Sequence, residues 1–126
     1  MNKDEVIKQL RILDLPKEEY YVLSGASLVL RGIREKCSDI DLCISEELFN
    51  KEKNNLGMTP DKLNACGFYQ LSDTLEIIVD KKSLFNMEEG EEFNYKNINT
   101  ILDFKKSRNL PKDKSDIINI QKYLIK

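Results

Sequence analysis

Histidine is absent from this sequence of 126 residues, and cysteine occurs only three times. Without histidine, a triad of serine, histidine and aspartate is excluded, so a general base must be a carboxylate, a lysine, a tyrosine or metal-bound water. Cys37, Cys43 and Cys66 are odd in number and have no CxxC spacing, which argues against a zinc site. We therefore expect reduced, structural thiols.

Long apolar runs and basic tracts are also missing. No apolar run approaches the length of a membrane-spanning helix, and the first ten residues, MNKDEVIKQL, lack the core of a signal peptide. We expect a cytoplasmic protein with no membrane contact. The net charge of −2 argues against strong nonspecific binding of nucleic acid, although a local basic groove is compatible with it.

Repeats, linkers and low-complexity segments are absent as well. The hydrophobic content of 40% over 126 residues is enough for one core and too little for two. The sequence therefore predicts a single domain covering residues 1–126.

Two aspartates, Asp39 and Asp41, stand two residues apart in the segment SDIDLCIS (38–45). The segment alternates in the manner of a β-strand, on which residues i and i+2 share one face and lie roughly 6 to 7 Å apart. The opposite, apolar face is expected to meet the core and consists of Ile40, Leu42 and Ile44. Neighbouring carboxylates repel each other unless a cation lies between them, and magnesium prefers such oxygen ligands.

A second alternating segment, residues 75–80, places Glu76 on its polar face. This glutamate would complete a group of three acids if the two strands lie in one sheet. An acid between hydrophobic residues is also typical of the solvent-facing side of a half-covered sheet, and this alternative stays open, above all for Glu76.

A glycine turn precedes the aspartates. Residues 20–24 are expected to form a strand, and Gly25 follows directly before an apolar pattern with helical spacing at Ala26, Val29, Leu30 and Ile33. A glycine between a strand and a helix lets backbone amides approach a phosphate, which the helix N-terminus also favours.

In this order, the parts resemble the nucleotidyltransferase superfamily, whose fold is that of DNA polymerase beta and which includes small bacterial antibiotic-modifying and toxin–antitoxin enzymes. The resemblance is carried by YYVLSGASLVLRGIREKCSDIDLCIS (20–45), by TLEIIVD (74–80) and by the tail RNLPKDKSDIINIQKYL (108–124). The family pattern is a strand, a glycine followed by glycine or serine, two acids after about ten residues, and a third acid on a later strand. Ala26 departs from this pattern.

The resemblance implies a magnesium-dependent transfer of a nucleoside monophosphate from a nucleoside triphosphate (NTP) to a hydroxyl group, with release of pyrophosphate. It implies that Asp39, Asp41 and Glu76 are catalytic and bind two magnesium ions. The residues that it implies for nucleotide binding are Ser24, Gly25, Ala26, Ser27, Arg34, Ser38 and Lys112. The acceptor stays open between a small molecule, a tRNA and a protein.

Two other functions remain compatible with the sequence. The chain is short, so it has little room for a separate acceptor-binding domain. One alternative is a weakly active or inactive module of a toxin–antitoxin pair, which binds a small helical partner. The other is a nucleotide sensor, which binds a nucleotide without turnover.

The expected fold class is α/β in the broad sense, and more narrowly α+β. It consists of a mixed, mostly antiparallel, twisted sheet of about four to five strands with helices packed on it. We also predict a hairpin of residues 68–71 and 75–79, and an edge strand within 92–98. Tyr20, Tyr21, Phe68 and Phe104 are expected in the core. The expected helices are 4–14, 46–55, a short one capped by Thr59 and stopped by Gly67, one ending near 107, and a last one carrying Ile117, Ile120 and Leu124.

Overall fold

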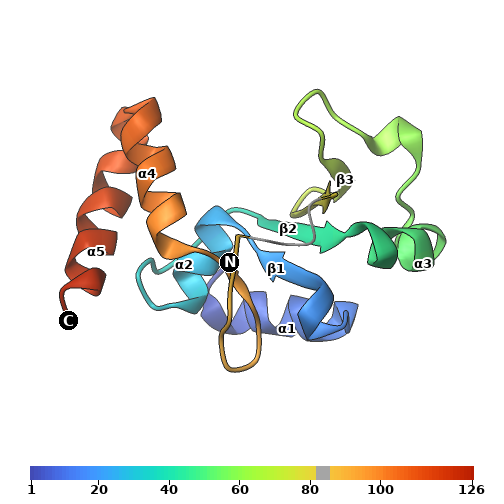
Figure 1. Cartoon of the computed structure of the whole chain (residues 1–126), viewed down its shortest axis with the longest axis horizontal. Helices are drawn as coiled ribbons and strands as arrows, with labels where there is room; N and C mark the ends of the chain where they lie inside the picture. The colour runs from blue at the N-terminus through green and yellow to red at the C-terminus, as the bar shows by residue number, and fades with distance from the viewer. Residues whose placement is uncertain (82–85) are drawn as a thin grey trace.

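A computed structural model describes residues 1–81 and 86–126. Within them, five α-helices accompany one open, mixed sheet of six strands, in an α+β architecture (Figure 1). The strands are β1 (Tyr20–Val22), β2 (Ile40–Ser45), β3 (Tyr69–Ser72), β4 (Leu75–Asp80), β5 (Met87–Glu88) and β6 (Tyr95–Lys96). The helices are α1 (Lys3–Leu13), α2 (Ser24–Leu30), α3 (Glu46–Leu56), α4 (Ile98–Arg108) and α5 (Lys114–Leu124).

The strands lie in the order β3-β4-β2-β1-β6-β5. Strand β2 is parallel to β4 and β1 is parallel to β6, while the other three pairs are antiparallel. The predicted hairpin is confirmed as β3 and β4. Two predictions about the sheet were wrong: within the described residues it has six strands rather than four or five, and β6 lies between β1 and β5 instead of at an edge. Strands of two residues, such as β5 and β6, are too short to show alternation in a sequence.

Local signals define the helix ends. Asn2 caps α1 by accepting a hydrogen bond from the backbone of Glu5, and the Ser45 hydroxyl does the same for Leu48 at the start of α3. Gly57 ends α3 in a left-handed conformation with φ of 72°. The short helix expected after Thr59 was predicted too long, since only a 3-10 turn at Pro60–Lys62 forms.

The main core lies on one face of the sheet. It receives the alternating side chains of β2 as predicted, because Ile40, Leu42 and Ile44 are almost completely buried there. Helix α1 contributes Val6 and Leu10 to the same cluster. Burial of such side chains is the dominant favourable term in folding, so the face of β2 that carries the carboxylates is left on the opposite side.

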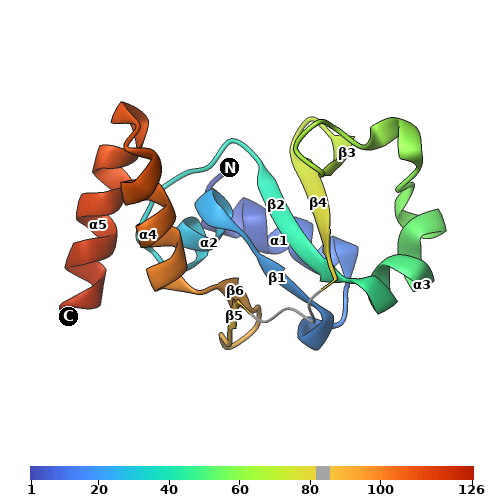
Figure 2. The same ribbon diagram turned by 45° about the horizontal axis from the view of Figure 1, so that its top comes forward.

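A second apolar cluster joins the C-terminal helices to α2. Leu28 of α2 packs with Ile101 of α4 and Ile120 of α5. Helices α4 and α5 lie side by side at one end of the molecule, and α3 lies at the other (Figures 1 and 2). Phe104 was predicted in the core but is 52% exposed, with the Arg108 guanidinium over its ring. In the part of the chain that is described, no helix is long and apolar enough to cross a bilayer.

Candidate functional site

Asp41 and Glu76 are direct neighbours across the parallel strands β2 and β4. In this register their side chains lie on the same face of the sheet, opposite the main core. Asp39 precedes β2 by one residue, and the Ser38 hydroxyl donates a hydrogen bond of 3.3 Å to its carboxylate. The structure therefore places Glu76 beside Asp41 on one sheet face, with Asp39 just before the strand and near enough for its charge to act on Asp41.

The Asp41 carboxylate lies in an unfavourable environment for a negative charge. Burial, and then the charges of Asp39 and Glu76, raise its pKa to about 6 from the usual value of 3.8. Its Oδ1 atom is buried and accepts no hydrogen bond from the described residues. An unpaired buried oxygen costs free energy of roughly 1 to 3 kcal/mol, and a divalent cation beside it would relieve both the repulsion and the missing partner.

The fit of a metal can be tested on these groups. Within residues 1–81 and 86–126, no three histidine, cysteine, aspartate or glutamate side chains are gathered closely enough to form a metal site. The donor chemistry of Asp39, Asp41 and Glu76 nevertheless suits magnesium, because all the donors are carboxylate oxygens and one of them is buried without a partner. These carboxylates fit the ion by charge and donor type.

Gly25 was expected to form the turn between the strand and α2, but it is not the turn residue. The positive φ, 31°, is at Ser24, and Gly25 already belongs to the helix. The missing side chain of Gly25 matters for space instead. A Cβ atom there would lie 3.2 Å from Nη1 of Arg34 and 3.6 Å from Cβ of Cys37. Gly25 thus leaves room for the Arg34 guanidinium beside the turn.

Two of the residues predicted to bind nucleotide point into the protein. Ala26 belongs to the main core, and Ser27 is fully buried. The Ser27 hydroxyl donates a hydrogen bond of 2.6 Å to the carbonyl oxygen of Ser24 and accepts one from Arg31. The Arg31 side chain is in turn bound to Glu88 at 3.0 Å. The side chains of Ala26 and Ser27 are therefore engaged in holding α2.

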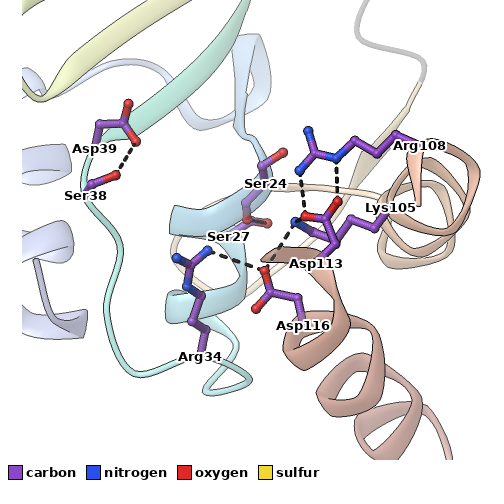
Figure 3. Close-up of polar contacts among 9 residues, drawn as sticks. All are labelled: Ser24, Ser27, Arg34, Ser38, Asp39, Lys105, Arg108, Asp113 and Asp116. Carbon is purple, nitrogen blue, oxygen red and sulfur yellow. Dashed lines mark hydrogen bonds and ion pairs between the residues drawn. The ribbon is translucent and has the colours of Figure 1, made fainter. Parts of the chain in front are cut away.

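Most of the other predicted site residues line one cavity of about 410 Å³. It lies between the turn into α2, the start of β2 and the junction of α4 with α5 (Figure 3). The predicted residues that it brings together are Ser24, Gly25, Arg34, Ser38, Asp39, Asp41 and Lys112. Glu76 is not in this lining, although it lies beside Asp41.

The far wall of this cavity is a buried ion network that sequence reasoning did not identify. Arg108 binds Asp113 through two hydrogen bonds of 2.6 and 2.7 Å, and Lys105 lies 3.3 Å from both Asp113 and Asp116 (Figure 3). The hydrogen bonds from Arg108 lower the pKa of Asp113 to about 2. The sequence signal for this network is a spacing of three residues, which separates Lys105 from Arg108 and Asp113 from Asp116.

The network also holds Arg34. The nearest contact is 3.5 Å, between Nη1 of Arg34 and the Asp116 carboxylate, and the Arg34 side chain is 40% exposed. Lys112 is exposed at the same cavity, and among the described residues it forms no ion pair. Arg34, held only by this long contact, and Lys112 are thus the cations at this cavity that can reach an anionic ligand.

Comparison of the chain with models of protein families, with curated proteins and with solved structures found no match.

Proposed function

We propose that this protein is a magnesium-dependent nucleotidyltransferase, which moves a nucleoside monophosphate from an NTP to a hydroxyl acceptor. The observation that carries the proposal is the position of Asp41. Its buried, unpartnered oxygen lies beside Glu76 and at a cavity that Arg34 and Lys112 also line. One cavity thus combines carboxylates that can bind a metal ion, Asp39 and Asp41, with basic side chains that can bind phosphates, Arg34 and Lys112.

Asp39 and Asp41 would hold magnesium, and Glu76 would either complete the ligands or accept a proton. The ion would supply charge neutralisation to the triphosphate and would lower the pKa of the acceptor hydroxyl. Gly25, which has no side chain, leaves room for the Arg34 guanidinium beside the turn. Arg34 and Lys112 would bind the phosphate oxygens and orient the α-phosphorus toward the carboxylates.

The acceptor oxygen then forms a bond to the α-phosphorus. The bond between this phosphorus and the bridging oxygen of the β-phosphate breaks, and pyrophosphate leaves with that electron pair. The proton of the acceptor hydroxyl passes to a carboxylate, for which Glu76 is suited because it lies beside Asp41 and outside the cavity of Arg34 and Lys112. Arg34, bound weakly by Asp116, is available to the charge that develops on pyrophosphate.

Transfer of label tests the proposal. The protein is incubated with magnesium and each of the α-labelled ribonucleoside triphosphates in a lysate, and the labelled class of molecule is identified. Asp39→Asn and Asp41→Asn should each reduce labelling by at least about a hundredfold. Asp103→Asn, an exposed site on α4, is the matched control and should label normally. Equal labelling by a folded Asp39→Asn, Asp41→Asn double variant would contradict the assignment.

A second function is favoured by the surface of the C-terminal helices. Of the eight large hydrophobic residues that are exposed in the described chain, six lie between residues 104 and 125. They are Phe104, Leu110, Ile118, Tyr123, Leu124 and Ile125. Exposed apolar side chains of this kind are candidates for contact with a partner protein, as expected for an inactive module of a toxin–antitoxin pair. Absence of labelling, together with co-purification of a small helical protein that Ile118→Lys abolishes, would favour this function.

A nucleotide sensor is distinguished from both by calorimetry. It would bind an NTP in the presence of magnesium and release no pyrophosphate with any acceptor class.

A further inference from the structure

The sheet face that carries the carboxylates continues into an apolar surface. Cys43 is two residues beyond Asp41 on β2, and it pairs in register with Ile78 of β4 and with Tyr21 of β1. Residues two apart on a strand are roughly 6 to 7 Å apart on the same face. One step along the strands therefore leads from Asp41 and Glu76 to a row formed by Tyr21, Cys43 and Ile78.

This row forms the floor of a hollow of about 540 Å³. Leu23, Phe68 and Val79 add further apolar wall, and three charged residues, Asp80, Lys81 and Lys96, complete the lining. Tyr21, Leu23 and Cys43 form an apolar cluster separate from the main core. Small-molecule sites have volumes of roughly 300 to 1,000 Å³, mostly apolar walls and a few polar groups that fix orientation. The hollow has all three properties.

The row itself offers no charge to a ligand. Its side chains are a phenol, a thiol and an alkyl group, and the charged residues of the lining, Asp80, Lys81 and Lys96, lie outside the row. A neutral ring or alkyl chain would therefore bury apolar surface against the row.

We propose that this hollow binds the apolar body of the acceptor, a small aromatic or aliphatic alcohol, with its hydroxyl directed toward Asp41 and Glu76. The proposal rests on the proposed transferase function for its chemistry. The alcohol oxygen forms the bond to the α-phosphorus, the bond to the β-phosphate oxygen breaks, pyrophosphate leaves, and the hydroxyl proton passes to the carboxylate group. The product is a phosphodiester of the alcohol and the nucleoside.

Binding is tested without nucleotide or metal, so that it does not depend on turnover. The probe is 2-phenylethanol, and methyl signals of isoleucine and leucine are followed by NMR as it is added. Saturable shifts are expected at Ile78 and Leu23, with no response at Ile118 on α5. Ile78→Lys should weaken binding at least tenfold, and the matched exposed variant Ile118→Lys should bind as the wild type does. Shifts of equal size at Ile118 would overturn the proposal.

If Ile78→Lys does not fold, Phe68→Ala serves as a second variant. Phe68 is partly exposed at the wall of the hollow, so its truncation should keep the fold and still weaken binding of the probe. Unchanged binding in folded Phe68→Ala would overturn the proposal.

A transfer assay then separates this inference from the function on which it rests. The protein receives labelled NTP, magnesium and either 2-phenylethanol or a short RNA. Label on the alcohol that is lost in Ile78→Lys supports the inference. Label on RNA alone, equal in wild type and Ile78→Lys, overturns the inference and leaves the transferase function standing. Saturable binding of the alcohol with no labelled product from either acceptor contradicts the transferase function and the acceptor role together.

Discussion

Asp41 lies directly beside Glu76 in the parallel pairing of β2 with β4. Parallel neighbours on one face bring two carboxylates close together, and like charges so placed are destabilising. Burial adds to this cost, and the pKa of Asp41 rises to about 6. A position that harms stability in this way is typical of functional sites.

The first prediction concerns stability without a metal. Asp41→Asn should increase the free energy of unfolding by about 1 kcal/mol at pH 7.5 in a chelator. The folded pKa of Asp41, about 6, is above its usual 3.8, so its favourable contribution is present below pH 3.8 and lost as pH rises through 6. Asparagine carries no charge and does not suffer this loss, so the variant should be more stable than the wild type at pH 7.5. Below pH 4 the two proteins should be equally stable. Urea unfolding measures it, with Asp103→Asn as the control that should show no gain.

The second prediction concerns magnesium. Saturating magnesium should raise the stability of the wild type by roughly 1 to 3 kcal/mol, because the ion binds the folded carboxylates and not the unfolded chain. Asp41→Asn should remove most of this increase. Thermal unfolding with and without magnesium measures the effect, and calcium provides a test of selectivity. An identical increase in both proteins would show that the ion binds elsewhere.

The third prediction compares two glycines. A Cβ atom at Gly25 meets the end of the flexible Arg34 side chain at 3.2 Å, whereas a Cβ atom at Gly90 would lie 2.3 Å from the backbone oxygen of Phe93. Gly25→Ala should change stability by less than about 0.5 kcal/mol but weaken NTP binding, since Arg34 must move. Gly90→Ala should destabilise the fold by about 1 to 3 kcal/mol. Calorimetry and urea unfolding measure the two effects, and a destabilised Gly25→Ala would contradict the first.

The fourth prediction concerns the buried ion network. Asp113→Asn should cost about 3 to 5 kcal/mol, because it leaves the buried Lys105 and the bound Arg108 without their main partner. The folded pKa of Asp113 is lowered to about 2. Its contribution is therefore present above its usual value of 3.8 and lost as pH falls toward 2.

An exposed ion pair provides the matched control for the network. Arg11 and Glu92 form a comparable contact of 2.7 Å at the surface, with side chains 64% and 46% exposed. Glu92→Gln should cost less than about 1 kcal/mol. Urea unfolding of both variants between pH 7 and pH 2 tests the contrast. Equal costs would mean that burial of the network contributes nothing.

Much of the fold was predictable from local patterns. The alternation of residues 38–45 and 75–80 predicted β2, β4 and their buried faces, and the caps at Ser45 and Gly57 define the ends of α3. The strand β5 was not predicted, and β6, which lies within the strand predicted at 92–98, was expected at an edge of the sheet. Each has two residues, and they form because β1 offers β6 an edge for hydrogen bonds. Tertiary context, and not propensity, creates strands of this kind.

The candidate site was predictable to the same extent. The alternation of residues 38–45 indicated Asp39 and Asp41 as site residues. The resemblance implied Arg34 and Lys112 as well, and all four line the same cavity. The direction of the Ser27 side chain could not be predicted, because it depends on how α2 is rotated about its axis against the core. Asp113 and Asp116 were missed because their partners are on another helix, and charge spacing within one helix does not tell which helix packs against it.

The sequence by itself determined that Asp41 lies on a strand, on the face opposite Ile40, Leu42 and Ile44, and that any base must act without histidine. Only the tertiary structure decided that Glu76 lies beside Asp41, that Ser24 carries the strained turn and that α4 and α5 close the cavity with buried ions. The reason is physical. A period of two assigns a side chain to a face, whereas its neighbours on that face depend on strand order and register, which are set by hydrogen bonds between segments far apart in the chain.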